Sequence, residues 1–368
     1  MKVAIVLGPG ADFSVDEPNP IETVVRTLAR HSRDRDDLLI LCDEGAADRG
    51  DLNTLTVPYR NEDRGRRTRH VIEALKAFGP DFIECQQHGP TSARIARAFP
   101  HIPSSLYRHN LAVGAKGPID RLRFRHRYSP FDAHVFVGEF LRADFAAKFP
   151  EFAARGYAMP NPIDASLWPG DPHDKDRLIA FAGRATPEKG LDLLCDALAV
   201  VLARRPDWRT ALVLNDWHVH EDWSRAQLDK LSAFGGRVSV KTSQPLAVVQ
   251  ETLKRAAIVA VPSVFQDPFP LAVLEAHAVG AAVVSSGRGG LKQASGGHAV
   301  IVDPLTGQNL AEAIDGLIAE PSRRLALAVA GQDYVVTEYD ARRRATALDD
   351  LRAQLVAARR VAGTPATV

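Results

Sequence analysis

Short apolar runs bounded by turn-forming residues alternate along this chain with segments whose apolar positions recur at helical spacing. Runs of this length are typical of buried parallel strands, which helical crossovers connect, so the alternation predicts an α/β fold with doubly wound sheets. We expect helices near 21–31, 68–78 and 139–149, and one helix between each pair of strands in the second half. We expect strands near 3–7, 38–41, 82–85, 104–107, 134–137, 178–182, 209–214, 237–240, 258–261, 282–285 and 299–302.

A stretch rich in proline and aspartate and without periodicity, MPNPIDASLWPGDPHDKD, separates the two halves near residues 160–176. We therefore expect an N-terminal Rossmann-like domain over 1–165 and a C-terminal one over 166–335, facing each other across a cleft. A charged helix over 336–368 should pack back toward the first domain and end in a frayed tail.

Composition narrows the class of protein. A chain of 368 residues can bury roughly two domain cores, and its formal net charge of +1 gives no general affinity for nucleic acid. Three distant cysteines, Cys42, Cys85 and Cys195, lack the CxxC spacing of a zinc or redox site and fit a reducing cytosol. The opening MKVAIVLGPG reads as a strand rather than a secretion signal, and no apolar run reaches the roughly 18–20 residues of a spanning helix. We expect a cytoplasmic protein.

Charge is uneven within the first domain. Residues 60–127 carry 14 Lys/Arg against 6 Asp/Glu, whereas residues 1–59 carry 6 against 11. Such a basic face favours peripheral contact with an anionic membrane, at the inner face of a cell membrane, or is an ordinary solvated surface. Both interpretations stay open at this point.

The segment FAGRATPEKGLDLLCDAL places two cations, Arg184 and Lys189, beside a predicted helix start that follows Gly183. The positive end of the helix dipole disfavours a lysine there by a few tenths of a kcal/mol, up to about 1 kcal/mol. An anion would reverse that sign, so the segment predicts a pyrophosphate site. The alternative is a solvated basic loop in which Glu188 is the local counter-charge.

The segment VPSVFQDPFPLAVLEAHAVG sets Glu275 inside an otherwise apolar helix. A buried polar group without a partner costs about 2–7 kcal/mol, so Glu275 should find donors in the protein or in a ligand; we expect ligand hydroxyls. Asp267, just before Pro268, has two interpretations. It is either the N-cap of this helix, with proline at the first helical position, or a second ligand contact.

Further candidates lie at other predicted strand ends, where open parallel sheets bind ligands. The turn SSGRGGLKQASGG offers backbone amides around Gly289 and Gly290. In the first half, His88 and His109 follow strands, and Asn110 adjoins the latter; a strand-end histidine is otherwise a structural donor. Paired aspartates at 34–36 and 174–176 precede strands, the wrong end for a ligand, so we expect no metal site.

Together the segments FAGRATPEKG, DPFPLAVLEAHAVG, YRHNLA and MPNPID resemble, in order and spacing, the retaining glycosyltransferases of family 4, a GT-B group that includes bacterial glycogen synthase and transferases of surface glycans. The resemblance implies that Arg184 and Lys189 hold the diphosphate of a nucleotide-sugar donor. It implies that Glu275 binds the ribose and Asp267 the transferred sugar, with His109 near the sugar hydroxyls.

The resemblance also implies a donor site and a reaction. The donor-binding set would be Gly183, Arg184, Lys189, Asp267, Phe269, Leu271, Glu275, Gly289 and Gly290, with His88 and Asn110 on the acceptor side. A hexose would pass with retention to a glycan or lipid-linked acceptor, as in polysaccharide or lipopolysaccharide biosynthesis, while the leaving diphosphate helps to deprotonate the acceptor. No cofactor or metal is implied, because cations and a helix N-terminus neutralise the leaving group.

Some positions depart from the family pattern. Asp267 stands where the family has glutamate, Gln293 stands where glutamate is frequent, and PNP replaces an early double glycine. Uridine donors are favoured over guanosine and adenosine donors only by their frequency in the family. Two other functions stay open: an inactive nucleotide-sugar-binding homologue, and an NAD(P)-dependent oxidoreductase, although LGPG lacks the spacing of a dinucleotide fingerprint.

Overall fold

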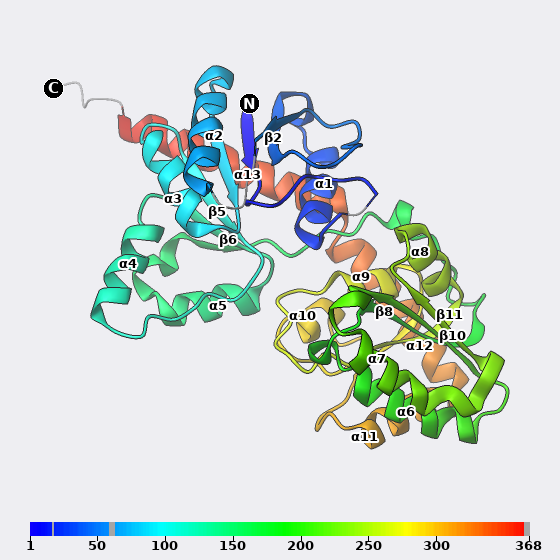
Figure 1. Cartoon of the computed structure of the whole chain (residues 1–368). Coiled ribbons are helices and arrows are strands. Elements are labelled where there is room, and N and C mark those ends of the chain that lie inside the picture. Colours follow the sequence, from blue (N-terminus) through cyan, green and yellow to red (C-terminus); the bar gives the residue numbers. More distant parts are fainter. Residues whose placement is uncertain (17, 59–62, 364–368) are drawn as a thin grey trace. The chain divides into compact units, whose positions relative to one another are not determined.

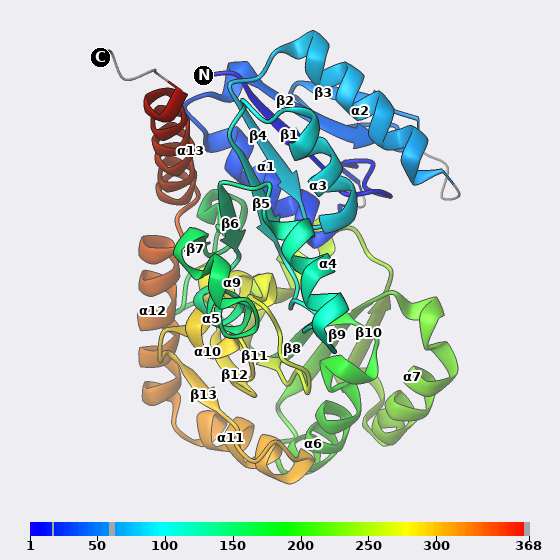
Figure 2. The same cartoon turned by 90° about the vertical axis from the view of Figure 1, so that its left-hand side faces the viewer.

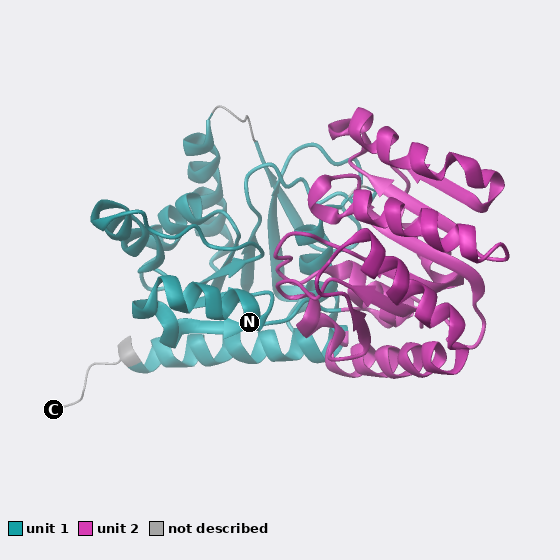
Figure 3. Cartoon of the chain, turned by 90° about the horizontal axis from the view of Figure 1, so that it is seen from below, with its two compact units in different colours: residues 1–162, 341–368 teal, residues 163–340 magenta. Residues whose placement is uncertain are grey.

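The computed structural model describes residues 1–16, 18–58 and 63–363, and the chain divides into two compact units (Figure 1, Figure 3). Unit 1 holds Met1–Pro162 and the C-terminal segment that starts at Ala341, and unit 2 holds Ile163–Asp340. Residues 364–368 of the expected frayed tail lie outside the described residues. Each unit has helices packed around a parallel sheet, so the predicted α/β class is confirmed.

Unit 1 contains a seven-stranded sheet in the order β3-β2-β1-β4-β5-β6-β7, and every pair in it is parallel. The strands are β1 (Val3–Val6), β2 (Leu38–Asp43), β3 (Thr54–Val57), β4 (Phe82–Gln86), β5 (Ser104–Arg108), β6 (Ala133–Phe136) and β7 (Gly156–Ala158). The helices are α1 (Pro20–His31), α2 (Arg64–Phe78), α3 (Gly89–Ala98), α4 (Pro118–Tyr128), α5 (Glu139–Lys148) and α13 (Ala341–Gly363), with 3-10 turns at Arg35–Asp37 and Pro150–Arg155.

The chain changes direction across this sheet after β3, so right-handed crossovers place α1 on one face and α2 and α3 on the other. The contacts agree, because α1 packs against α13, whereas α2 packs against α3 and α3 against α4 (Figure 2). α13 therefore completes the α1 face of unit 1. Within the described residues no helix combines the length and apolarity needed to cross a bilayer.

Unit 2 repeats the same strand order in a six-stranded parallel sheet, β10-β9-β8-β11-β12-β13. The strands are β8 (Asp176–Arg184), β9 (Arg209–Asn215), β10 (Val238–Thr242), β11 (Ala256–Val261), β12 (Ala282–Ser285) and β13 (Ala299–Ile301). The helices are α6 (Leu191–Arg204), α7 (Glu221–Leu228), α8 (Leu246–Arg255), α9 (Leu271–Ala278), α10 (Leu291–Ser295), α11 (Gly307–Ala319) and α12 (Pro321–Glu338). Three-residue 3-10 turns lie at Ala165–Leu167, Pro187–Lys189 and Trp217–Val219, and a nine-residue 3-10 segment lies at Asp229–Arg237.

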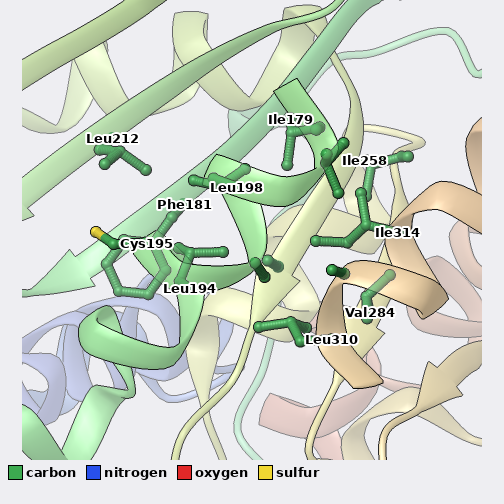
Figure 4. Packing of buried hydrophobic residues seen from close by; sticks show 14 of the residues in the cluster. Ile179, Phe181, Leu194, Cys195, Leu198, Leu212, Ile258, Val284, Leu310 and Ile314 are labelled. Carbon is green, nitrogen blue, oxygen red and sulfur yellow. The ribbon is translucent and has the colours of Figure 1, made fainter. Parts of the chain in front are cut away.

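The core of unit 2 fixes the strand ends that matter for function. Leu194 and Leu198 of α6 pack with Leu310 and Ile314 of α11 over strand residues such as Ile258 (Figure 4). These apolar positions recur at three and four residues along each helix, so one face of the helix is buried. The rigid packing holds the start of α6 against the ends of β8 and β11.

The expected strands are confirmed to within a few residues, but the sequence pattern missed β3 and β7. Two of the four residues of β3 are exposed, and β7 is only three residues long and begins at a glycine. Neither forms the continuous apolar run from which the other strands were predicted. Edge strands of this kind are not buried on both faces. Burial on both faces is what produces the apolar run from which the other strands were predicted.

Candidate functional site

The strand order of unit 2 reverses between β8 and β11, and the loops that leave the carboxyl ends of these two strands meet there. Open α/β sheets bind their ligands at such a switch point. Gly183 and Arg184 are the last two residues of β8, and residues 262–270 connect β11 to α9. A backbone hydrogen bond of 2.9 Å from Val264 N to Glu188 O joins the two loops.

The β8 loop turns into α6 through Gly190, whose φ of +73° lies in the left-handed region. A Cβ atom at this position would lie 2.2 Å from the carbonyl oxygen of Pro262, so only glycine fits. Lys189 immediately precedes Gly190 and so lies at the N-terminal end of the fourteen-residue α6. The predicted arrangement of a cation at a helix start is confirmed.

Lys189 and Asp267 form an ion pair with 2.6 Å between Nζ and Oδ2. Asp267 is 5% exposed, and Lys189 also lies over the ring of Phe265, 5.1 Å from its centroid. The interpretation of Asp267 as the N-cap of α9 is wrong, because α9 begins at Leu271 and its N-cap position is Pro270. Pro268 and Pro270 follow Asp267 and Phe269, and proline disfavours helical geometry in the residue before it.

Arg184 pairs with Glu188 at 3.1 Å, and both side chains are largely exposed. The sequence-based alternative of a local counter-charge is thus present in the structure. Exposed pairs of this kind are worth about 0–1 kcal/mol. Arg184 can therefore exchange Glu188 for a stronger anion at little cost.

Glu275 lies on α9, in the apolar surroundings that the sequence predicts. Its side chain is partly exposed, and no hydrogen bond or ion pair to its carboxylate occurs within the described residues. Burial raises its pKa from 4.5 to about 7. A carboxylate held in this way gains from hydrogen-bond donors that a ligand brings.

The glycine-rich turn before α10 lies directly against the β11–α9 loop. A Cβ at Gly289, where φ is +62°, would lie 2.4 Å from Asp267 O, and a Cβ at Gly290 would lie 2.0 Å from Pro268 O. The N–H of Gly290 donates to Asp267 O at 2.6 Å, so this amide is already occupied. The Phe269 ring is buried against Tyr339 at 5.2 Å, and Leu271 opens α9.

His109 directly follows β5 in unit 1 and is buried. Its Nε2 lies 2.7 Å from Gln86 Oε1, its backbone N–H donates to Gln87 Oε1 at 2.8 Å, and its ring stacks on Tyr107 at 5.0 Å. Burial, with a smaller contribution from Arg108, lowers its pKa to about 3. His109 is therefore a neutral ring in a fixed orientation.

His88 is the N-cap of α3, and its Nδ1 lies 2.8 Å from Thr91 Oγ1. Burial first, and then the charges of Arg64 and Arg127, lower the pKa of His88. These contacts are those of a structural cap. Asn110, one residue past His109, is exposed at the same edge of the sheet.

Comparison with known proteins matches both halves of the chain to one group of enzymes. Residues 21–167 match the family described as Glycosyltransferase Family 4, and residues 176–320 match the family described as Glycosyl transferases group 1. The chain belongs to glycosyltransferase family 4. Its two parallel Rossmann-like sheets are those of the GT-B fold.

Relatives of this family-4 chain include two curated bacterial proteins. The α-maltose-1-phosphate synthase of Mycolicibacterium smegmatis is 28% identical over 56% of the chain and 59% of the relative. The lipopolysaccharide 1,2-N-acetylglucosaminetransferase of Salmonella typhimurium is 26% identical over 53% of the chain and 54% of the relative. The match thus spans little more than half the length of each. Among solved structures, HepE of Anabaena with UDP is similar with a TM-score of 0.79, 17% identity and coverage of 96% of this chain and all of that one.

Several side chains near the candidate site residues were not predicted from the sequence. Phe265 beneath Lys189 had no motif to mark it, although it lies two residues before Asp267. Glu84 and Arg352 are hydrogen-bonded to each other in unit 1, but they are 268 positions apart, so no local pattern joins them. The one available signal was a glutamate inside the apolar strand FIECQ, which needs a partner just as Glu275 does.

Proposed function

We propose that the chain is a retaining glycosyltransferase that moves a hexose from a nucleotide-diphospho-sugar to a glycan or lipid-linked acceptor. The observation that carries the proposal is the arrangement in unit 2. Lys189 and Arg184 flank the start of α6, while Glu275 presents a carboxylate without a partner in the described residues. Two cations and a helix N-terminus suit a diphosphate, and a carboxylate suits a diol such as ribose.

The diphosphate would bind by exchange of partners. Lys189 and Arg184 each hold a carboxylate, Asp267 and Glu188, in the protein without ligand. A diphosphate at the start of α6 offers both cations a more highly charged partner and also meets the helix dipole. Asp267, released from Lys189, would then accept hydrogen bonds from hydroxyls of the sugar.

The ribose would bind to Glu275. Its hydroxyls would supply the hydrogen bonds that the carboxylate lacks, and binding would lower the raised pKa of Glu275. The N–H of Gly289 is the amide of the glycine turn left to face the sugar or phosphate, because that of Gly290 is taken. Substitution Glu275→Ala should weaken donor binding by about 1–3 kcal/mol.

The transfer step breaks the bond from the anomeric carbon to the diphosphate oxygen and forms a bond to the acceptor oxygen on the same face. The acceptor proton passes to the leaving phosphate oxygen, so the nucleoside diphosphate departs with it. Lys189, Arg184 and the start of α6 stabilise the charge that develops on the leaving group. Since these groups supply that charge, we expect turnover to persist in the presence of a chelator.

A uridine donor is the best first choice, because structures of HepE, which shares the fold, hold UDP and UDP-glucose. Membership of family 4 favours transfer over an NAD(P)-dependent oxidoreductase. An inactive homologue that binds nucleotide-sugar but never consumes it remains the second candidate, because Asp267 and Gln293 depart from the family pattern.

The test is a thermal-shift panel of nucleoside diphosphates, nucleotide-sugars and NAD(P), run with chelator and followed by detection of released nucleoside diphosphate. We expect stabilisation by one class of nucleoside diphosphate and slow donor hydrolysis. Stabilisation by NAD or NADP instead would reject the proposal. Binding without consumption of donor, with any acceptor extract, would identify the inactive homologue.

We also propose that unit 1 contacts an anionic membrane through α4. Three strongly exposed apolar side chains, Val113 at 68%, Ile119 at 71% and Leu122 at 69%, lie on and just before this helix. They lie among the exposed Arg121, Arg123 and Arg125, and we call these six residues the α4 patch. Ile119 and Leu122 share a helix face, so they can enter the headgroup region while the arginines contact anionic lipid.

Co-sedimentation with anionic vesicles at low salt tests the α4 patch. The double variant Ile119→Ser/Leu122→Ser and the charge variant Arg121→Glu/Arg125→Glu should each lose most of the bound fraction. Val219→Ser, at a 55% exposed position of unit 2, is the matched control and should bind like the unsubstituted protein. Equal binding to uncharged vesicles, or no effect of either double variant, would reject this contact.

A further inference from the structure

A continuous chain of buried hydrogen bonds runs behind His109 in unit 1. Nε2 of His109 lies 2.7 Å from Gln86 Oε1, and Gln86 Nε2 donates to Glu84 Oε1 at 2.8 Å. Glu84 Oε2 accepts two hydrogen bonds from Arg352 of α13, at 3.1 and 2.9 Å. Glu84 and Gln86 are two residues apart on β4 and so point to the same face of the sheet.

The far end of this chain is anchored on α13 and α1. Arg352 Nη1 donates to Asp349 Oδ1 at 3.0 Å, and Asp349 also accepts from Ser32 Oγ at 2.9 Å and from the backbone N–H of Arg33 at 2.9 Å. Glu84, Arg352 and Asp349 are all at most 2% exposed. A buried ion pair of this kind adds little stability over apolar packing, so its value lies in the single arrangement that it specifies.

The chemistry of the donors and acceptors fixes the position of each proton in this series of hydrogen bonds. A carboxylate only accepts hydrogen bonds, so the amide NH₂ of Gln86 must face Glu84. The carbonyl oxygen of Gln86 then faces His109, and Nε2 of His109 must carry the hydrogen. Burial keeps the ring neutral, with a pKa of about 3. Nδ1 consequently carries a lone pair and no hydrogen, and it makes no hydrogen bond within the described residues.

We propose that Glu84, Gln86 and Arg352 are positioning residues that lock His109 in the Nε2–H tautomer and so present Nδ1 as a hydrogen-bond acceptor for a ligand hydroxyl. The last step, that the ligand is the sugar of the donor, rests on the proposed function. His109 would then recognise a group that donates a hydrogen bond, and it would disfavour a carboxylate or phosphate oxygen at that point. The charge recognition of unit 2 and the hydroxyl recognition of unit 1 are thereby separate.

The variant Glu84→Gln should reverse the direction of the hydrogen bonds between residue 84, Gln86 and His109, with almost no change in the shape of the side chain. Arg352 still requires an oxygen, so the new NH₂ group must face Gln86, whose amide then flips. The NH₂ of Gln86 would face His109, and Nε2 would have to accept. His109 should therefore change to the Nδ1–H tautomer, and Nδ1 would lose its acceptor lone pair.

Heteronuclear NMR of the histidine ring nitrogens in the full chain reads this tautomer directly, with the His109 signals assigned by their loss in His109→Phe. We expect Nε2–H in the unsubstituted protein near neutral pH and Nδ1–H in Glu84→Gln. Glu22→Gln is the matched control, because Glu22 is a buried glutamate of unit 1 whose side chain accepts from Phe13 and Asn19 instead. An Nδ1–H or protonated His109 in the unsubstituted protein, or an unchanged tautomer in Glu84→Gln, would overturn the proposal.

A second variant keeps the proposal testable if Glu84→Gln does not fold. Gln86→Met keeps the volume but removes both hydrogen bonds, so His109 should populate both tautomers. Donor turnover should fall by up to about tenfold in Glu84→Gln, the loss of one hydrogen bond, and by less in Gln86→Met, which keeps part of the Nε2–H tautomer, while the thermal shift with nucleoside diphosphate stays unchanged in both. A single Nε2–H tautomer in Gln86→Met would overturn the proposal. Absence of turnover together with the expected tautomers would reject the proposed function alone.

Discussion

The two units present different chemistry at the carboxyl ends of their sheets: unit 2 at the switch-point strands β8 and β11, and unit 1 after β5, one strand beyond its own switch point. Both sheets reverse their strand order after three strands, and both carry their conspicuous polar residues at the carboxyl ends near that point. Unit 2 gathers ionic side chains there, Lys189 with Asp267 and Arg184 with Glu188. Unit 1 instead presents the neutral ring of His109, held by buried hydrogen bonds. Under the two proposals above, the same architecture would serve charge binding in one unit and hydroxyl recognition in the other.

The substitution Lys189→Ala should have the largest effect, because it removes a cation from the proposed diphosphate site of unit 2. Loss of one preorganised charge contact typically lowers the rate about 10²–10³-fold. We expect donor turnover to fall by that factor and the thermal shift with nucleoside diphosphate to disappear. The exposed Lys241→Ala in β10 is the matched control. A normal thermal shift in Lys189→Ala would mean that unit 2 does not bind charge in this way.

Removal of Lys189 also leaves Asp267 buried without its cation, so a loss of stability must be separated from a loss of binding. The double variant Lys189→Ala/Asp267→Asn removes the uncompensated charge. It should recover most of the unfolding free energy that the single variant loses, but none of the nucleotide binding. Recovery of binding as well would show that the single variant failed through misfolding.

The substitution Gly290→Ala should destabilise unit 2 next most strongly. The added Cβ would lie 2.0 Å from the carbonyl oxygen of Pro268, which is backbone and cannot move aside cheaply. Overpacking of this kind costs about 1–3 kcal/mol. Gly316→Ala in α11, where nothing lies within 4 Å, is the control and should instead gain roughly 0.5–1 kcal/mol. Denaturant unfolding of both variants measures the difference, and equal stabilities would disprove the close approach.

The substitution Glu275→Gln should change how stability depends on pH. The folded protein holds the pKa of Glu275 at about 7 against an ordinary 4.5, so it binds a proton that the unfolded chain has lost. Stability without ligand should therefore fall as pH rises from about 4.5 through 7, by up to about 3 kcal/mol. Glutamine removes this fall, whereas the exposed Glu251→Gln should leave it in place. Parallel pH profiles for Glu275→Gln and the unsubstituted protein would contradict the raised pKa.

The substitution His109→Phe should have the smallest effect on nucleotide binding. Its ring is neutral and belongs to unit 1, so we expect the thermal shift with a nucleoside diphosphate to match that of the unsubstituted protein. Turnover of the complete donor should fall, since the proposed contact with a sugar hydroxyl is lost. A large loss of nucleoside diphosphate binding would break the proposed division of labour between the two units.

Local patterns predicted much of the fold and supplied the candidate site residues of unit 2. Leu191, Leu194, Leu198 and Val201 recur at helical spacing, and all are fully buried. The same reasoning marked Glu275, because a charged residue in an apolar helix requires a partner. Of the two interpretations of Asp267, the helix cap is wrong: a proline after an aspartate imitates a cap, but α9 starts three residues after Pro268. A cap is a local pattern, but the actual start of a helix depends on how the segment packs.

The sequence by itself determined the alternation of strands and helices, the family segments and the cations at the start of α6, because each depends on residues that are neighbours along the chain. Only the tertiary structure decided which partner each charge takes. Lys189 meets Asp267 across 78 positions, and Arg352 meets Glu84 across 268. Such pairs form because crossovers bring strand ends and helices together, and periodicity within one element carries no information about that meeting.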